Sequence, residues 1–218
     1  SGGEVVLLEG APSGILIDAP MELINKTIPP LSRDQKIKAL KDAEKVCLEL
    51  GLTTINDAGL NRDIIELIDS LQQSGELSIK VYAMISNTKS NRDHYFEKGI
   101  IKTNRLTVRS FKVYADGALG SRGAAMLDSY SDKENHFGAF ITPKDSINYY
   151  AQQIAISGFQ MNTHAIGDAA NTIVLEAYRK ALRGTKDLRW KVEHAQVLPY
   201  AGLGYFSRDI IPSVQPTH

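Results

Sequence analysis

Short apolar segments alternate with amphipathic stretches along most of the chain from Leu31 onward. Apolar runs of about four to eight residues are typical of buried strands, and apolar positions three and four residues apart are typical of helices that cover a sheet. Strands and helices that alternate in this way predict a parallel sheet of the α/β class. The expected strands are Leu52–Asn56, Ile79–Ile85, Leu106–Ala115, Phe159–His164, Trp190–Gln196 and Ile210–Gln215.

Capping residues mark the helices between these strands. Ser32 is the expected N-cap of a helix that runs through about Leu50 with Ile37, Leu40, Val46 and Leu50 inside, and Asp168 is the expected N-cap of a helix to Leu182. Three further helices are expected at about 61–75, 92–98 and 143–157. Six such units fit either an open doubly wound sheet or most of an eight-stranded barrel.

The two ends of the sequence differ from this repeating pattern. Residues 1–30 contain turns and short apolar runs but no clear strand and helix unit, and the sequence stops at His218 directly after a strand. We therefore expect one domain that is truncated at both ends, with residues 1–30 as an insertion or a cap segment. A length of 218 residues favours one domain over two.

Composition narrows the kind of partner. The chain has 25 Lys and Arg and 25 Asp and Glu, so its net charge is zero, which argues against nucleic acid or a membrane surface as the partner. No apolar run is long enough to span a membrane and no signal peptide is visible, so a cytoplasmic location is favoured. The single cysteine, Cys47, lies in a helical run and is expected to be a small buried apolar residue.

Lys112 is expected to point into the interior of the sheet structure. Alternation along Leu106–Ala115 puts Phe111 and Val113 on the face that helices cover, and Lys112 on the opposite face. A buried lysine is unfavourable by several kcal/mol unless it is paired, neutralised or chemically modified. Lys112 is therefore either part of a salt bridge across the interior or a functional group.

Two histidines end consecutive predicted strands. His164 ends one strand and His194 lies at the equivalent position of the next, at the edge of the sheet where α/β proteins build their sites. For His194 the alternation is less regular, because an inward His194 would turn Lys191 and Glu193 outward among the helices. Imidazole nitrogen suits zinc, so the two histidines together with Lys112 predict a metal site.

Two other residues are candidates for substrate contacts. The glycine-rich segment Asp116–Gly123 matches neither nucleotide-binding fingerprint, but its backbone amides and Arg122 are expected to shape the mouth of the site and meet a substrate oxygen. A plain tight turn is the alternative interpretation. His218 follows Pro216, which breaks the last strand, and we assign it a substrate contact rather than a metal.

Four segments in a fixed order resemble the amidohydrolase superfamily, and within it the amidohydrolase 3 group related to N-substituted formamide deformylase. They are Phe111–Arg122, Asn162–Asp168, Val192–Gln196 and Ser213–His218. Residues 51–59 also resemble the second barrel strand of that group and its exit. The resemblance spans about residues 10 to 218.

This resemblance implies an incomplete (β/α)8 barrel of the TIM type with one or two divalent metal ions, expected to be zinc. Lys112, His164 and His194 match the family's ligand positions on strands 4, 5 and 6, and the lysine is often carbamylated. The family's His-x-His and its strand 8 aspartate have no counterpart in this sequence. The whole protein is expected to hydrolyse a non-peptide carbon–nitrogen bond of a small molecule with a metal-activated water, while this fragment is expected to be inactive by itself.

Two rival interpretations stay open. Lys112 in a barrel interior is also suited to Schiff-base chemistry on a carbonyl substrate, as in a lyase or aldolase. The third interpretation is a non-catalytic barrel fragment. In each case the open edges of an incomplete barrel favour association, so we expect a homo-oligomer or a covering of the seam by residues 1–30.

Overall fold

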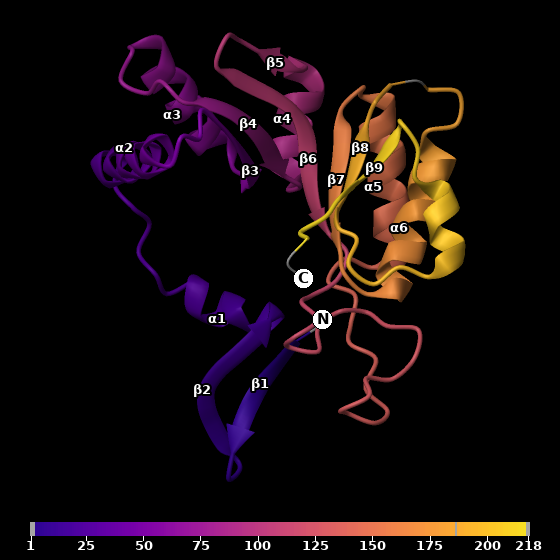
Figure 1. Ribbon diagram of the computed structural model, residues 1–218. Helices are drawn as coiled ribbons and strands as arrows, with labels where there is room; N and C mark the ends of the chain where they lie inside the picture. The colour runs from indigo at the N-terminus through magenta and orange to yellow at the C-terminus, as the bar shows by residue number, and fades with distance from the viewer. Residues whose placement is uncertain (1–2, 186, 217–218) are drawn as a thin grey trace. The chain divides into compact units, whose positions relative to one another are not determined.

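The computed structural model describes residues 3–185 and 187–216 (Figure 1). Contacts within the chain divide it into two units. The first unit comprises Ser1–Ile28 and Val113–His218, and the second comprises Pro29–Lys112. Whether the chain acts as one domain stays a prediction. No helix in the described part of the chain is long and apolar enough to cross a membrane.

The second unit is built on parallel strands. Strand β4 pairs in parallel with β3 on one side and with β6 on the other, and the short β5 adds to β6 in the antiparallel direction. The bounds are β3 Thr54–Leu60, β4 Lys80–Ser86, β5 Ile101–Lys102 and β6 Leu106–Tyr114, the last two residues of which belong to the first unit. The parallel pairing of the predicted strands is confirmed here, whereas β5 was not predicted.

Strand β3 begins and ends later than the sequence predicts. We expected Leu52–Asn56 and find Thr54–Leu60, a strand that continues through Asp57 and Gly59. Its residues are only half-buried or exposed, in alternation. Because the strand pairs with β4 on one side only in this unit, it needs no continuous apolar run, and the apolar pattern marked its position poorly.

Helices α2 and α3 of the second unit begin at their predicted caps, Ser32 and Asn61, whereas α4 begins three residues before the predicted Arg92, because Thr88 is its N-cap. One of these helices also packs differently from the prediction. The unit contains α2 (Arg33–Glu49), α3 (Arg62–Gln73) and α4 (Lys89–Lys98). Ser32 and Gln35 form a reciprocal capping box at the start of α2, as the sequence indicates. However, α2 buries none of its residues: Val46 and Leu50 are exposed, and Cys47 is half-buried rather than buried. Glu44 instead links α2 to the start of β4, since its Oε1 accepts the backbone N–H groups of Ser78 and Ile79.

The first unit holds a second set of parallel strands. Strand β8 (Trp190–His194) pairs with β7 (Gln160–Ala165) and β9 (Ile210–Ser213), both in parallel. Helices α5 (Lys144–Ile156) and α6 (Asp168–Ala181) pack against each other and cover β7, as Figure 1 shows. The core between these layers includes Ile154, Val174, Leu175, Tyr178 and Trp190, all fully buried. A 3-10 helix, η2 (Tyr200–Tyr205), joins β8 to β9.

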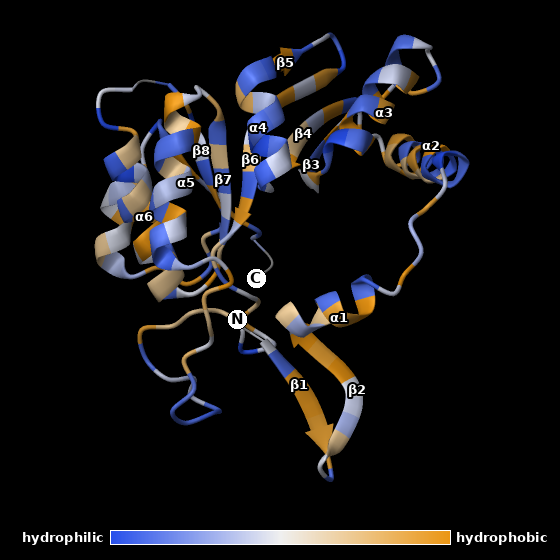
Figure 2. Ribbon diagram, turned by 180° about the vertical axis from the view of Figure 1, so that it is seen from behind, coloured by the Kyte–Doolittle hydropathy of each residue, from blue (hydrophilic) through white to orange (hydrophobic). Residues whose placement is uncertain are grey.

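The amino-terminal segment forms an antiparallel hairpin. It consists of β1 (Gly3–Leu8) and β2 (Ala11–Asp18), followed by the short helices η1 (Ala19–Met21) and α1 (Glu22–Asn25). Figure 2 shows that β1 is largely hydrophobic, and Leu7 and Leu8 are nevertheless exposed. The hairpin is consistent with the predicted insertion or cap segment, and that role stays a prediction.

Candidate metal centre

His164 lies at the carboxyl end of β7 and faces away from the helices. Its neighbour Thr163 faces them, because the Thr163 hydroxyl lies 2.7 Å from the hydroxyl of Tyr178 in α6. Strand alternation then turns His164 to the opposite face, as the sequence predicts. The His164 side chain is 13% exposed, so its imidazole lies in a largely enclosed environment.

His194 ends β8 in an unusual backbone conformation. Trp190, four residues earlier, packs edge to face on Tyr178 with ring centroids 4.7 Å apart, so regular alternation would turn His194 toward the helices as well. The backbone leaves the extended conformation instead, with φ of 76° at His194 and 44° at Ala195. Left-handed backbone is unfavourable for residues other than glycine, and this break in the alternation redirects the imidazole.

The redirected His194 meets His164. Their ring centroids lie 4.7 Å apart at an interplanar angle of 73°. We expected that an inward His194 would turn Lys191 and Glu193 toward the helices. That expectation is wrong, because Trp190 occupies the helix face and the residues that alternate with it lie on the other face.

Asp116 is a component of this site that the sequence reasoning missed. The carboxylate is fully buried and accepts the backbone N–H groups of Ile166, Gly167 and Ala125 at 2.8–3.0 Å. Its Oδ1 lies 3.7 Å from Nε2 of His164. Burial raises the pKa of Asp116 to about 6, and the three backbone N–H groups oppose this shift only in part. Its place directly after β6, where strand ends carry sites, was the available indication.

The last residue of β6 and the residues that follow it lie beside His164. The backbone N–H of Ala115 donates to the carbonyl of His164 at 2.9 Å, and the ring of Tyr114 lies 5.7 Å from the imidazole between centroids. Nε2 of His164 lies 3.4 Å from the carbonyl oxygen of Gly117. The carboxyl ends of β6 and β7 therefore meet at the candidate site within the first unit.

Lys112 precedes these residues in the same strand and is buried, with 4% of its surface exposed. It pairs in register with Ser86 of β4. Lys112 is the last residue of the second unit, whereas both histidines belong to the first. Its convergence with His164 and His194 stays a prediction.

The structure places the remaining candidates as follows. Arg122 adopts a left-handed backbone conformation, and its guanidinium forms two hydrogen bonds with the carboxylate of Asp132, at 2.8 and 3.1 Å. Its substrate contact stays a prediction. His218 lies outside the described residues. Asp168 is not the N-cap of α6: Gly167 is, and one oxygen of Asp168 accepts the N–H of Leu127 instead, which fastens the loop before α5 to the start of α6.

The two imidazoles supply part of the donor set of the predicted metal site. Within the described residues, no group of three or more His, Cys, Asp or Glu side chains is arranged to hold a metal ion. The pair of imidazoles fits two positions of a zinc or similar divalent site, since both are nitrogen donors held at strand ends. A complete site needs further ligands beyond this pair.

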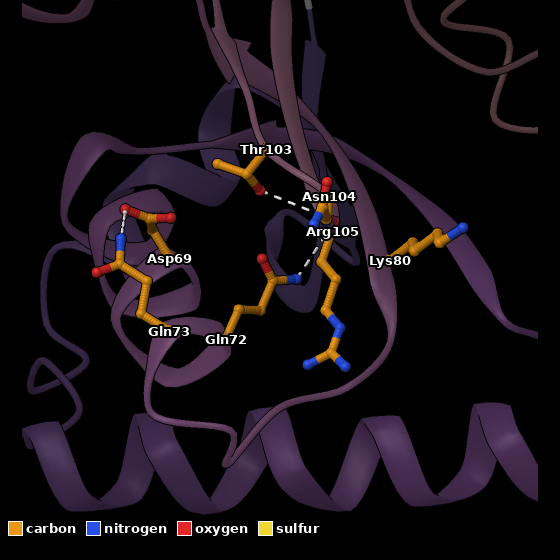
Figure 3. A pocket seen from close by; sticks show the side chains of 7 residues that line it. All are labelled: Asp69, Gln72, Gln73, Lys80, Thr103, Asn104 and Arg105. Carbon is orange, nitrogen blue, oxygen red and sulfur yellow. Dashed lines mark hydrogen bonds between the residues drawn. The ribbon is translucent and has the colours of Figure 1, made fainter.

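Two pockets help to locate the site. One of about 200 Å³ is lined by His194, Ala195, Gln196, Val214 and Gln215, at the carboxyl ends of β8 and β9. Another, of about 610 Å³, lies in the second unit near the amino ends of β4 and β6, where Figure 3 shows the side chains of Lys80 and Arg105 pointing in different directions. Because parallel β/α folds place their sites at the carboxyl ends of strands, the smaller pocket is the one that belongs to the candidate site.

Parallel strands covered by helices, with histidines at the carboxyl ends of adjacent strands, form a candidate site of the kind that β/α proteins build at strand ends. The chain matches the model of the Amidohydrolase family over residues 2–217 and belongs to that family. The predicted fold class, an incomplete (β/α)8-type barrel, is confirmed by this membership and by the solved structure described next.

Three similar proteins show how much of a longer chain this sequence covers. Protein LONG AFTER FAR-RED 3 of Arabidopsis thaliana is 31% identical over all of this chain and 40% of that protein. N-substituted formamide deformylase of Arthrobacter pascens is 24% identical over 89% of this chain and 38% of that protein. The crystal structure of an uncharacterized metal-dependent hydrolase from Pyrococcus horikoshii OT3 has a TM-score of 0.75 and 26% identity, over 90% of this chain and 39% of that one. The chain therefore spans about two fifths of the length of these proteins.

Proposed function

We propose that this chain forms the central part of a metal-dependent hydrolase that cleaves a non-peptide carbon–nitrogen bond of a small molecule. The observation that carries the proposal is the pair of imidazoles, His164 and His194, brought to 4.7 Å at the ends of adjacent parallel strands. Family membership supports hydrolysis, and the similarity to a formamide deformylase supports the carbon–nitrogen bond.

The ligands in this proposal are His164, His194 and Lys112, with zinc as the favoured metal. A divalent metal, when bound, polarises a carbonyl and lowers the pKa of water. Lys112 is proposed to be carbamylated, which would convert an ammonium that is unfavourable when buried into a carboxylate. Lys112 stands two residues before Tyr114 in β6, and alternation gives the two residues the same face of the strand.

The remaining parts of the proposal concern substrate and assembly. Arg122 and His218 are proposed to contact the substrate, and Asp116 to hold the strand end that carries His164. Because the chain spans about two fifths of its relatives, we propose that it is inactive by itself and that the hydrolase is the longer protein, as a homo-oligomer.

Metal analysis of the longer protein tests this function. The wild-type protein should contain stoichiometric divalent metal, and His164→Ala should remove the metal and the hydrolysis of N-formyl amides together. His94→Ala is the matched control, because His94 lies in α4 and is not one of the proposed ligands. A His164→Ala protein that keeps both metal and activity would end the metal-hydrolase interpretation.

The same preparation distinguishes the Schiff-base alternative. If Lys112 is carbamylated or bound to metal, treatment with borohydride and a simple aldehyde should leave the mass of the peptide that contains Lys112 unchanged. Covalent trapping at Lys112 in a metal-free wild-type protein would favour the lyase instead.

A further inference from the structure

We infer that Gln215 is a positioning residue that holds the imidazole of His194 in its Nδ1–H tautomer. Gln215 follows β9 and comes to His194 across the strand pair β8 and β9. Its Oε1 lies 2.7 Å from Nδ1 of His194. The inference rests on the proposed function for its purpose, but the tautomer itself is a property of the chain without metal.

The orientation of the Gln215 amide is fixed by a second contact. Its Nε2 donates to the backbone carbonyl of Ser213 at 3.2 Å. A carbonyl oxygen only accepts, so the NH2 group must face Ser213, and Oε1 must face the histidine. An oxygen acceptor at 2.7 Å requires a proton on Nδ1 of a neutral imidazole.

The proton on Nδ1 determines the state of the other ring nitrogen of His194, Nε2. With the proton on Nδ1, Nε2 keeps its lone pair, which is the form that binds a metal. Within the described part of the chain, no hydrogen bond engages Nε2 of His194. The tautomer that Gln215 selects is therefore the one that leaves Nε2 able to act as a ligand.

The backbone strain at the end of β8 supports a positioning role. His194 and Ala195 are consecutive non-glycine residues with positive φ, and such conformations persist where surrounding contacts hold them in place. The hydrogen bond to Gln215 is one such contact. It fixes the rotation of the imidazole ring about the Cβ–Cγ bond as well as the tautomer. A pocket of about 200 Å³ lies beside these residues and is lined by both His194 and Gln215.

Nitrogen NMR of the metal-free 218-residue chain, at a pH where the imidazole is neutral, tests the tautomer directly. The wild-type chain should show a protonated Nδ1 and an unprotonated Nε2 for His194, assigned by comparison with His194→Asn. Gln215→Met removes the acceptor at similar size and should shift the tautomer toward Nε2–H, whereas Gln215→Glu keeps an acceptor and should retain Nδ1–H. Gln152→Met is the matched control, because Gln152 is exposed in α5 and does not line this pocket, so the tautomer should stay unchanged.

Metal binding by the longer protein gives the second measurement. Loss of a residue that orients a metal-ligating histidine weakens metal binding by about 10–100-fold, and Gln215→Met should do so while Gln152→Met does not. A wild-type Nε2–H tautomer, or a tautomer that Gln215→Met leaves unchanged, would overturn the inference. A wild-type protein that binds no metal but shows the Nδ1–H tautomer would overturn the proposed function and leave the positioning of His194 by Gln215 standing.

Discussion

One carboxylate oxygen of Asp116 accepts the backbone N–H of Gly167 at 2.8 Å. The two residues are 51 positions apart in the chain: Asp116 follows β6, and Gly167 is the N-cap of α6, just after β7. The same carboxylate accepts the N–H groups of Ile166 and Ala125. Asp116 therefore fastens the long loop after β6 to the strand end that carries His164, and the geometry of the candidate site depends on it.

Removing this carboxylate should destabilise the first unit. Asp116→Ala leaves three buried backbone N–H groups without their acceptor, and we expect the free energy of unfolding to fall by about 2–4 kcal/mol. Urea denaturation followed by circular dichroism measures the loss. Asp128→Ala, in the same loop but exposed, is the control and should change the value by less than about 0.5 kcal/mol. Equal stability of the two variants would contradict this role for Asp116.

The raised pKa of Asp116 gives a distinct pH dependence in the metal-free chain. Its pKa is about 6 in the folded state against an ordinary 3.8, because burial disfavours the carboxylate. The folded state therefore holds the proton more tightly, so the contribution of this group is complete below about pH 4 and is lost as the pH rises through 6. Relative to Asp116→Asn, which does not titrate, the wild-type chain should lose on the order of 3 kcal/mol over this range. A difference that is constant with pH would show that the carboxyl group has an ordinary pKa.

The contrast between His164 and His194 shows what alternation predicts. His164 lies in a regular strand, so the alternation of side chains along the strand correctly predicted that it faces away from the helices. His194 ends its strand with a positive φ, and no pattern of apolar residues encodes that break. Its place at a strand end was predictable, whereas the direction of its ring depends on the backbone and on Gln215.

Asp116 and α2 show two further limits of the sequence. The partners of Asp116 are backbone N–H groups, up to 51 residues away. Because every residue except proline carries such a group, the sequence does not show which of them a carboxylate will bind. In α2, the capping box at Ser32 is local and was predictable, but the burial of Val46 and Leu50 depends on what packs against that face. Local hydrogen bonds and hydrophobic periodicity can be predicted from the sequence, whereas contacts between distant loops cannot.

Close packing at Gly167 predicts a steric effect. A Cβ at this position would lie 2.0 Å from the backbone oxygen of Ala125, although the φ of −69° suits any residue. Backbone cannot move aside as a side chain does, so Gly167→Ala should lower the free energy of unfolding by about 2–3 kcal/mol. Gly120→Ala, with nothing within 4 Å of the added carbon, should have little effect. Thermal unfolding of both variants makes the comparison, and equal midpoints would show that the loop at Ala125 yields.

The hydroxyl of Tyr178 connects α6 to the strand that ends in His164. It lies 2.7 Å from the hydroxyl of Thr163, and 2.9 and 3.0 Å from the carbonyl oxygens of Met161 and Lys191, in a fully buried position. Burial raises the pKa of Tyr178 far above its ordinary value, so the group stays protonated and keeps a proton to donate.

Tyr178→Phe should therefore lower the free energy of unfolding by about 1–2 kcal/mol, because buried partners lose a hydrogen bond without gaining water. Tyr149→Phe, at an exposed position of α5, is the control and should be neutral within about 0.5 kcal/mol. If the two hydroxyls bond to each other, Tyr178→Phe and Thr163→Val should couple by at least about 0.5 kcal/mol in a double-mutant cycle measured in urea. Additive losses would mean that the Tyr178 hydroxyl serves the carbonyl groups alone, and that the helix face of β7 is held by the backbone of Met161 and Lys191 rather than by Thr163.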